Sequence, residues 1–184
     1  MRGWMMVPAL LLAGCGDRQA VEVENASVAE VANQVRESGV EGAERFQPGA
    51  WTASLQLDEV SAPGVPPQMI EQMRRSMSNQ NSTRCLTEAE AKKPAGDFFT
   101  GQQVDQCRYD HFRMGDGKLD AKLTCQQPAA TQVMTMEGEY EPTSYQMRMT
   151  MVTTPTEAGA PGPMKMVMRV DARRTGECTG KEKA

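Results

Sequence analysis

Methionine recurs at every second position in three segments of the C-terminal half, residues 133–140, 144–152 and 164–170. Mostly polar or charged residues stand between, and this period of two is typical of β-strands, whose side chains alternate between the two faces of a sheet. Three such strands placed side by side would give one sheet face built almost entirely of thioether side chains. That face comprises Met134, Met136, Met147, Met149, Met151, Met164, Met166 and Met168.

A tight turn at residues 141–144, with proline at its second position, joins the first two segments and sets their register. This register places Met136 opposite Met149 on one face. On the other face it places Glu137 opposite Arg148, a favourable pair of opposite charges. Because that second face is polar, we expect the methionine face to point inward.

The pairing of the second and third segments is less well determined, because a long loop rich in Gly and Pro, residues 154–163, separates them. We expect Met147 to pair with Met168, since the alternative register would set Arg148 opposite Arg169. Both registers leave the methionines on one face.

Cys15 is followed by four further cysteines. An even number of cysteines in an exported protein predicts disulfides. The turn signal Gly-Asp-Gly at residues 115–117 predicts a hairpin in which Cys107 and Cys125 stand opposite each other. Directly opposed strand residues lie about 4.5–5.5 Å apart, which a disulfide can bridge. We therefore predict the bridges Cys107–Cys125 and Cys85–Cys178.

The same hairpin register pairs Asp110 with Lys122 and places His111 on the inner face, beside Cys107 and Tyr109. A zinc site is the rival interpretation of the cysteines. It is weak, because no two cysteines are close in sequence and the chain has one histidine. The chain also lacks a Gly-x-Ser-x-Gly elbow and a phosphate-binding glycine loop. We therefore expect no enzyme: no catalytic residue, no cofactor and no metal.

Residues 15–46 resemble a tether with one short helix, in which Ser27 and Glu30 have the spacing of a capping box. The folded domain is expected to span residues 47–178, and residues 179–184 a disordered tail. The other predicted elements of the domain are a strand at 51–57, a helix at 67–78, a strand at 82–86 and a short helix opened by Thr87. These elements predict a mainly β fold, an antiparallel meander forming a curved sheet or partly closed barrel, with two or three short helices.

The N-terminal sequence Leu12-Ala13-Gly14-Cys15 follows a short apolar stretch and resembles the lipobox of bacterial lipoproteins. The resemblance implies that the signal peptide, residues 1–14, is removed and that Cys15 carries acyl chains, which would anchor the protein to a membrane. The position after Cys15 is Gly16 and not the aspartate that often marks retention in the inner membrane. We therefore expect a periplasm-facing lipoprotein of the cell envelope, with the outer membrane favoured.

A set of motifs in a fixed order resembles the uncharacterised bacterial envelope family catalogued as domain of unknown function 3617. The motifs are Pro48-Gly49-Ala50-Trp51, Cys85-Leu86-Thr87 before an acidic helix, the Cys107 and Cys125 hairpin, Met/Thr-rich strands and a closing Arg174-x-Gly176-x-Cys178. The resemblance covers residues 46–178. It supports the compartment and the domain limits, and implies no activity.

The methionine face has three interpretations. The first is a flexible hydrophobic core in a structural or interaction domain. The second is a surface that binds an apolar ligand or lipid, since methionine adapts to varied partners. The third is a Cu(I) site, because thioethers favour that ion. Net charge is −4 and the basic residues are scattered, so no nucleic-acid partner is expected.

Overall fold

The computed structural model describes residues 20–38, 46–77, 80–91, 106–157, 159–160, 162–180 and 182. The strands are β1 (Val21–Ser27), β2 (Gly49–Ser61), β3 (Gln80–Leu86), β4 (Cys107–Gly115), β5 (Lys118–Gln127), β6 (Ala130–Glu141), β7 (Ser144–Pro155) and β8 (Met164–Gly176). The helices are α1 (Val28–Ser38), α3 (Pro67–Met77) and α4 (Glu88–Ala91).

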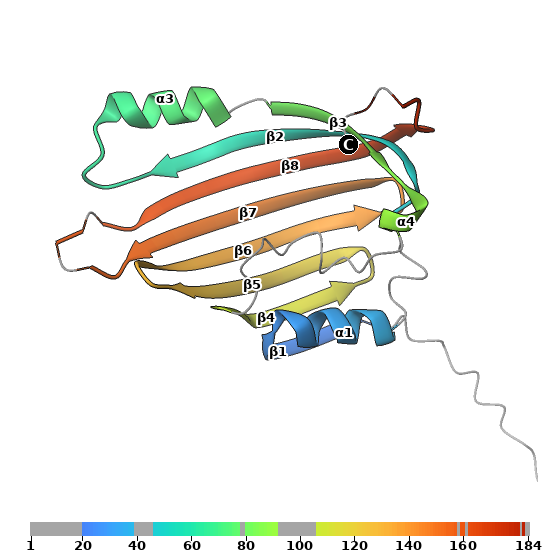
Figure 1. Ribbon diagram of the computed structural model, residues 1–184, viewed down its shortest axis with the longest axis horizontal. Coiled ribbons are helices and arrows are strands. Elements are labelled where there is room, and N and C mark those ends of the chain that lie inside the picture. The colour runs from blue at the N-terminus through green and yellow to red at the C-terminus, as the bar shows by residue number, and fades with distance from the viewer. Residues whose placement is uncertain are drawn as a thin grey trace, which may run out of the picture.

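The eight strands form one antiparallel sheet in the order β1-β4-β5-β6-β7-β8-β2-β3. Strands β4 to β8 are a meander of consecutive neighbours, whereas β2 and β3 extend the sheet beyond β8, and β1 extends it beyond β4. Figure 1 shows the long strands bending together without closing into a barrel. The predicted fold class is therefore confirmed in its open form, a curved sheet with three short helices in the described residues.

The β4–β5 hairpin has a two-residue turn and a β-bulge instead of the expected three-residue turn. Gly115 pairs with Lys118, and the register shifts at Asp110, so that Cys107 still faces Cys125. The bulge reverses which side chains point inward between Asp110 and the turn. Our expectation that His111 lies on the inner face is therefore wrong, and that side chain points to the polar face of the sheet.

The β6–β7 hairpin has the predicted register, with Met136 opposite Met149 and Glu137 opposite Arg148. The expected β7–β8 register is wrong, because Met149 rather than Met147 faces Met168. The observed register is the one that sets two arginines opposite each other. The carboxylate of Asp58 on β2 compensates the charge of these arginines. All eight methionines still share one face.

Residues Val21–Ser38 are part of the domain, so the expected tether is wrong for this segment. Strand β1 pairs with β4 at one edge of the sheet, and α1 packs against the inner face through the buried residues Val28, Val31 and Val35. The helix starts at the predicted capping box, in which the Ser27 amide donates to Glu30 (2.6 Å) and the Glu30 amide donates to Ser27 Oγ (3.2 Å).

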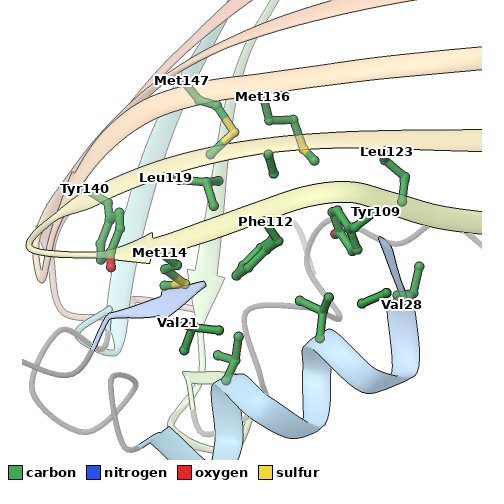
Figure 2. Packing of buried hydrophobic residues seen from close by; sticks show 14 of the residues in the cluster. Val21, Val28, Tyr109, Phe112, Met114, Leu119, Leu123, Met136, Tyr140 and Met147 are labelled. Carbon is green, nitrogen blue, oxygen red and sulfur yellow. The ribbon is translucent and has the colours of Figure 1, made fainter. Parts of the chain in front are cut away.

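The main core lies between α1 and strands β1, β4, β5, β6 and β7 (Figure 2). Tyr109, Phe112 and Met136 are almost fully buried in it, each at most 3 % exposed. A second cluster, at one end of the sheet, stacks Trp51 on Tyr145 with ring centroids 6.1 Å apart. We call the face that carries these side chains the apolar face.

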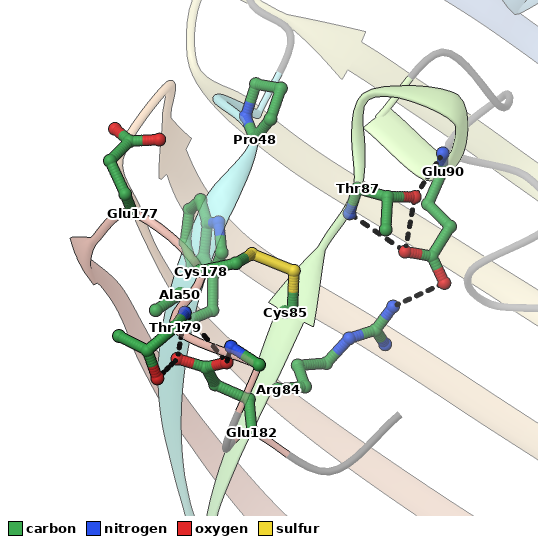
Figure 3. Close-up of a disulfide and its surroundings, with 12 residues drawn as sticks. Pro48, Ala50, Arg84, Cys85, Thr87, Glu90, Glu177, Cys178, Thr179 and Glu182 are labelled. Atoms are coloured by element: carbon green, nitrogen blue, oxygen red, sulfur yellow. Dashed lines mark hydrogen bonds and ion pairs between the residues drawn. A yellow bond between two sulfur atoms is a disulfide. The ribbon is translucent and has the colours of Figure 1, made fainter.

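Both predicted disulfides are present. Cys107–Cys125 joins neighbouring strands with Cα atoms 4.0 Å apart, and Cys85–Cys178 ties β3 to the chain beyond β8 at 5.5 Å. The second bridge lies beside the Thr87 cap of α4, in which the Thr87 amide donates to Glu90 (Figure 3).

Candidate functional site

The apolar face is buried unevenly along its strands. Its Met149 row runs across β6, β7, β8 and β2 and contains Met136, Met149, Met168 and Leu57. Its Met151 row, two residues further along β7, contains Met134, Met151, Met166 and Val60. In the Met149 row only Met149 is half-buried and the others are buried, whereas in the Met151 row only Val60 is buried.

Five of the eight predicted methionines are therefore half-buried, and they adjoin one another on β6, β7 and β8. We call them the open methionine surface: Met134, Met149, Met151, Met164 and Met166. The other three are buried: Met136, Met147 and Met168. The sequence places all eight on one face but gives no information on this gradient, because it depends on which helix covers which part of the sheet.

Helix α3 borders the open methionine surface on its β2 side. Ile70, Met73 and Met77 of α3 pack against the buried residues Leu57, Val60 and Met168, and Met149, Met151 and Met166 pack against the same three residues. None of the residues of α3 is itself buried, and Met69 in its first turn is 55 % exposed. Figure 1 shows α3 along the β2 side of the sheet, far from α1. The helix is therefore docked on the apolar face by contacts that remain partly open to solvent.

A polar side chain contacts the open methionine surface at its edge. The Gln132 side-chain amide donates to Met151 Sδ over 3.0 Å. This contact engages the sulfur of Met151 as a hydrogen-bond acceptor, and the side chain of Gln132 is itself half-buried. Thr153, which pairs with Gln132 and with Met164, adds a hydroxyl at the same edge. In the described residues the surface thus has an amide and a hydroxyl next to apolar groups, an arrangement typical of sites that bind apolar molecules with few polar contacts.

The polar face carries a row of paired charges. Asp58 accepts from Arg148 (3.1 Å) and Arg169 (2.8 Å), and Asp120 contacts His111 Nε2 at 2.9 Å. Among the residues that the structure describes, no group of three or more His, Cys, Asp or Glu side chains could hold a metal ion.

The predicted pair of Asp110 and Lys122 forms an ion pair of 2.8 Å although the bulge separates their backbone positions. The hydrogen bond from Lys122 lowers the pKa of Asp110. In the core, burial raises the pKa of Tyr109 to about 12 and raises the pKa of Tyr145 by the same cause. These tyrosines are structural groups of the apolar face, and neither lies beside a nucleophile.

Of the predicted site residues, the structure brings together the methionines and the two cysteine pairs. The lipidation site, Cys15, lies outside the described residues. The helix predicted at 67–78 is present as α3, whereas β1 was not predicted. The alternation Val-Glu-Val-Glu at residues 21–24 is a strand signal that could have indicated β1.

The chain thus defines a class of protein: an open, disulfide-bonded antiparallel sheet with an apolar face partly covered by helices. Residues 46–178 match the family model described as a protein of unknown function, DUF3617. The chain belongs to this family. No curated protein and no solved structure matches it. In the described residues, no helix is long and apolar enough to cross a membrane.

Proposed function

We propose that this protein is a non-enzymatic, lipid-anchored protein of the cell envelope that binds an acyl chain of a lipid on the open methionine surface beside α3. The observation that carries the proposal is the incomplete burial of this surface. Its five methionines and the inner side of α3 are half-buried, whereas the part of the same face beneath α1 is closely packed.

A purely structural role would be served best by completing the core. Burial of a methionine side chain contributes roughly 2 kcal/mol, so each half-buried member of the surface leaves part of that stabilisation unused. A ligand that covers these side chains would recover it. The bound molecule would have to be mainly apolar, because the surface offers sulfur and methyl groups, with the amide of Gln132 and the hydroxyl of Thr153 at its edge.

The geometry suits an extended chain. The Met151 row crosses four neighbouring strands, which at the usual spacing gives a length of roughly 14 Å. Methionine side chains are unbranched and polarizable, so they adapt to a flexible chain better than leucine or isoleucine would. Helix α3 contributes Ile70, Met73 and Met77 at the β2 side of the surface. An acyl chain would therefore lie along the Met151 row, with one end against α3.

The proposed anchor would hold this surface close to a source of acyl chains. If Cys15 is lipidated, residues 16–20 connect it to β1, and even a fully extended segment of this length spans only about 20 Å. Because β1 belongs to the sheet, the domain would then remain near the membrane rather than at the end of a long tether.

Native mass spectrometry of the full-length protein purified from membranes tests the proposal. We expect a mass increment of one lipid that is released on unfolding, in addition to the covalent modification of Cys15. The variant Cys15→Ser, secreted through a cleavable signal, should lack the covalent lipid and keep the releasable one. Wild-type protein that carries no releasable lipid, and takes up none from vesicles of phosphatidylethanolamine and phosphatidylglycerol, would contradict the proposal.

A further inference from the structure

The polar face is hollowed at the end of the sheet near the β6–β7 turn. The hollow has a volume of about 780 Å³ and lies across β6, β7, β8, β2 and β3. This volume is within the range of small-molecule sites. We call it the polar hollow; it is lined by Thr52, Ser54, Asn81, Glu139, Tyr140, Glu141, Ser144, Tyr145, Gln146, Asp171, Ala172 and Arg173.

The polar side chains of the hollow stand in two rows. One row runs through Glu141, Ser144, Arg173 and Thr52. The other runs through Glu139, Gln146, Asp171, Ser54 and Asn81 and crosses all five strands. At the usual spacing of strands, the longer row extends over roughly 19 Å.

The four charged side chains of these rows have no polar side-chain contact among the described residues. In the described residues, no ion pair or side-chain hydrogen bond involves Glu139, Glu141, Asp171 or Arg173. Other charges of the same face form ion pairs: Arg148 and Arg169 with Asp58, and Lys165 with Glu59. In the described part of the chain, these four charged groups of the polar hollow therefore lie close together without a side-chain partner in the protein.

We infer that the polar hollow binds a short neutral oligosaccharide. The three carboxylates accept hydrogen bonds and the guanidinium donates them, whereas the two amides and the three Ser and Thr hydroxyls can both donate and accept. A ligand that matches such a set must offer donors and acceptors together, as the hydroxyl groups of a sugar do. Planar carboxylate, amide and guanidinium groups can also form two hydrogen bonds at once with adjacent hydroxyl groups of a sugar ring.

Charge narrows the class further. The lining contains three acidic side chains and one basic side chain, so an anionic ligand would be repelled. A cation would satisfy the carboxylates alone and leave the hydroxyls, the amides and Arg173 without a role. The length of the longer row fits roughly three or four sugar rings, each spanning about one strand spacing.

The inference is independent of the proposed lipid site, because the polar hollow opens on the opposite face of the sheet. Substitutions on the open methionine surface should leave sugar binding unchanged. Loss of lipid binding would therefore not affect this inference, and loss of sugar binding would not affect the proposed function.

The test is a titration of the isotope-labelled, disulfide-intact protein by heteronuclear NMR with three probes: the trimer of N-acetylglucosamine, the cationic trimer of glucosamine and the anionic trimer of galacturonic acid. We expect the neutral trimer to shift the side-chain amides of Asn81 and Gln146 and the backbone amides of residues 171–173. The anionic trimer should produce no shifts at the same concentrations.

Asp171→Asn and Arg173→Gln should each weaken binding of the neutral trimer at least fivefold. The matched control is Glu157→Gln, an exposed carboxylate in the β7–β8 loop, which should leave binding unchanged. An unchanged amide spectrum outside the hollow would confirm that each variant is folded. Absence of shifts up to millimolar neutral trimer would overturn the inference, and so would binding of the cationic trimer more than tenfold tighter than the neutral one.

Discussion

Arg148 on β7 and Arg169 on β8 stand directly opposite each other, and both donate to Oδ2 of Asp58 on β2. Asp58 lies at a β-bulge, between Leu57 and Glu59, which adds one residue to β2 at this point. The bulge and the carboxylate together make an otherwise repulsive register acceptable, and this register aligns Met149 with Met168.

Removing this carboxylate should destabilise the sheet more than removing an ordinary surface charge. Asp58→Asn leaves two arginines opposed without compensation, and we expect a loss of about 1–2 kcal/mol in the free energy of unfolding, measured in urea. The matched control, Glu59→Gln, breaks the single exposed pair with Lys165 and should cost about 0.5 kcal/mol or less. Equal effects of the two substitutions would show that Asp58 does not stabilise the register.

Helices α1 and α3 should differ in their contribution to stability. Val31 of α1 is 1 % exposed in the main core, so Val31→Ala should cost about 2 kcal/mol. Met73 of α3 is only half-buried, so Met73→Ala should cost about 1 kcal/mol or less in spite of removing more atoms. Chemical unfolding of the two variants checks this order, and a larger cost at Met73 would mean that α3 is a fixed part of the core.

Alkaline pH should destabilise the protein through Tyr109. Burial raises the pKa of this phenol to about 12 in the folded state, above an unfolded value near 10. A group whose pKa is raised by folding stabilises the protein fully below the unfolded pKa and loses that contribution as the pH rises through the folded pKa.

Wild-type protein should therefore lose about 1 kcal/mol relative to Tyr109→Phe between pH 9 and pH 11. Urea unfolding at fixed pH values measures the difference, and tyrosinate absorbance follows the titration itself. Parallel pH profiles for the two proteins would contradict the assignment.

The longer disulfide should contribute more to stability than the shorter one. Cys85 and Cys178 are separated by 93 positions and Cys107 and Cys125 by 18. Chain-entropy arguments then give about 5 kcal/mol for the first bridge and about 3 kcal/mol for the second. Unfolding of the two Cys→Ala pair variants tests this order. Peptide mapping without reduction should yield the same two pairs, and a linked Cys85–Cys107 peptide would refute the assignment.

Short-range features of the sequence predicted the parts of the fold that depend on short-range geometry. The β6–β7 register was correct because a tight turn leaves two strands one way to pair. The Cys107–Cys125 bridge was also correct, although a two-residue turn and a bulge at Asp110 replace the expected three-residue turn. These two differences cancel at the cysteines and not at His111, whose predicted position was therefore wrong.

Features that depend on contacts between distant segments could not be predicted in the same way. The β7–β8 register depends on Asp58, which is 90 positions from Arg148 and 111 positions from Arg169 in the sequence. The half-buried state of Met151 likewise depends on where α3 packs. The sequence of β7, which contains Met151, does not indicate that position. The predicted methionine face was correct, but its open part became visible only with the helices in place.

The central claim is that the open methionine surface binds an acyl chain. The most direct measurement is a fluorescence titration of the disulfide-intact protein with a fluorescent fatty acid, competed by unlabelled palmitate. The double variant Met149→Gln/Met151→Gln makes the surface polar, and Thr154→Gln is its matched control, an exposed position on the same strand. We predict saturable binding to wild type and to Thr154→Gln, with at least tenfold weaker binding to the double variant. Equal binding by all three proteins, or none by wild type, would contradict the account.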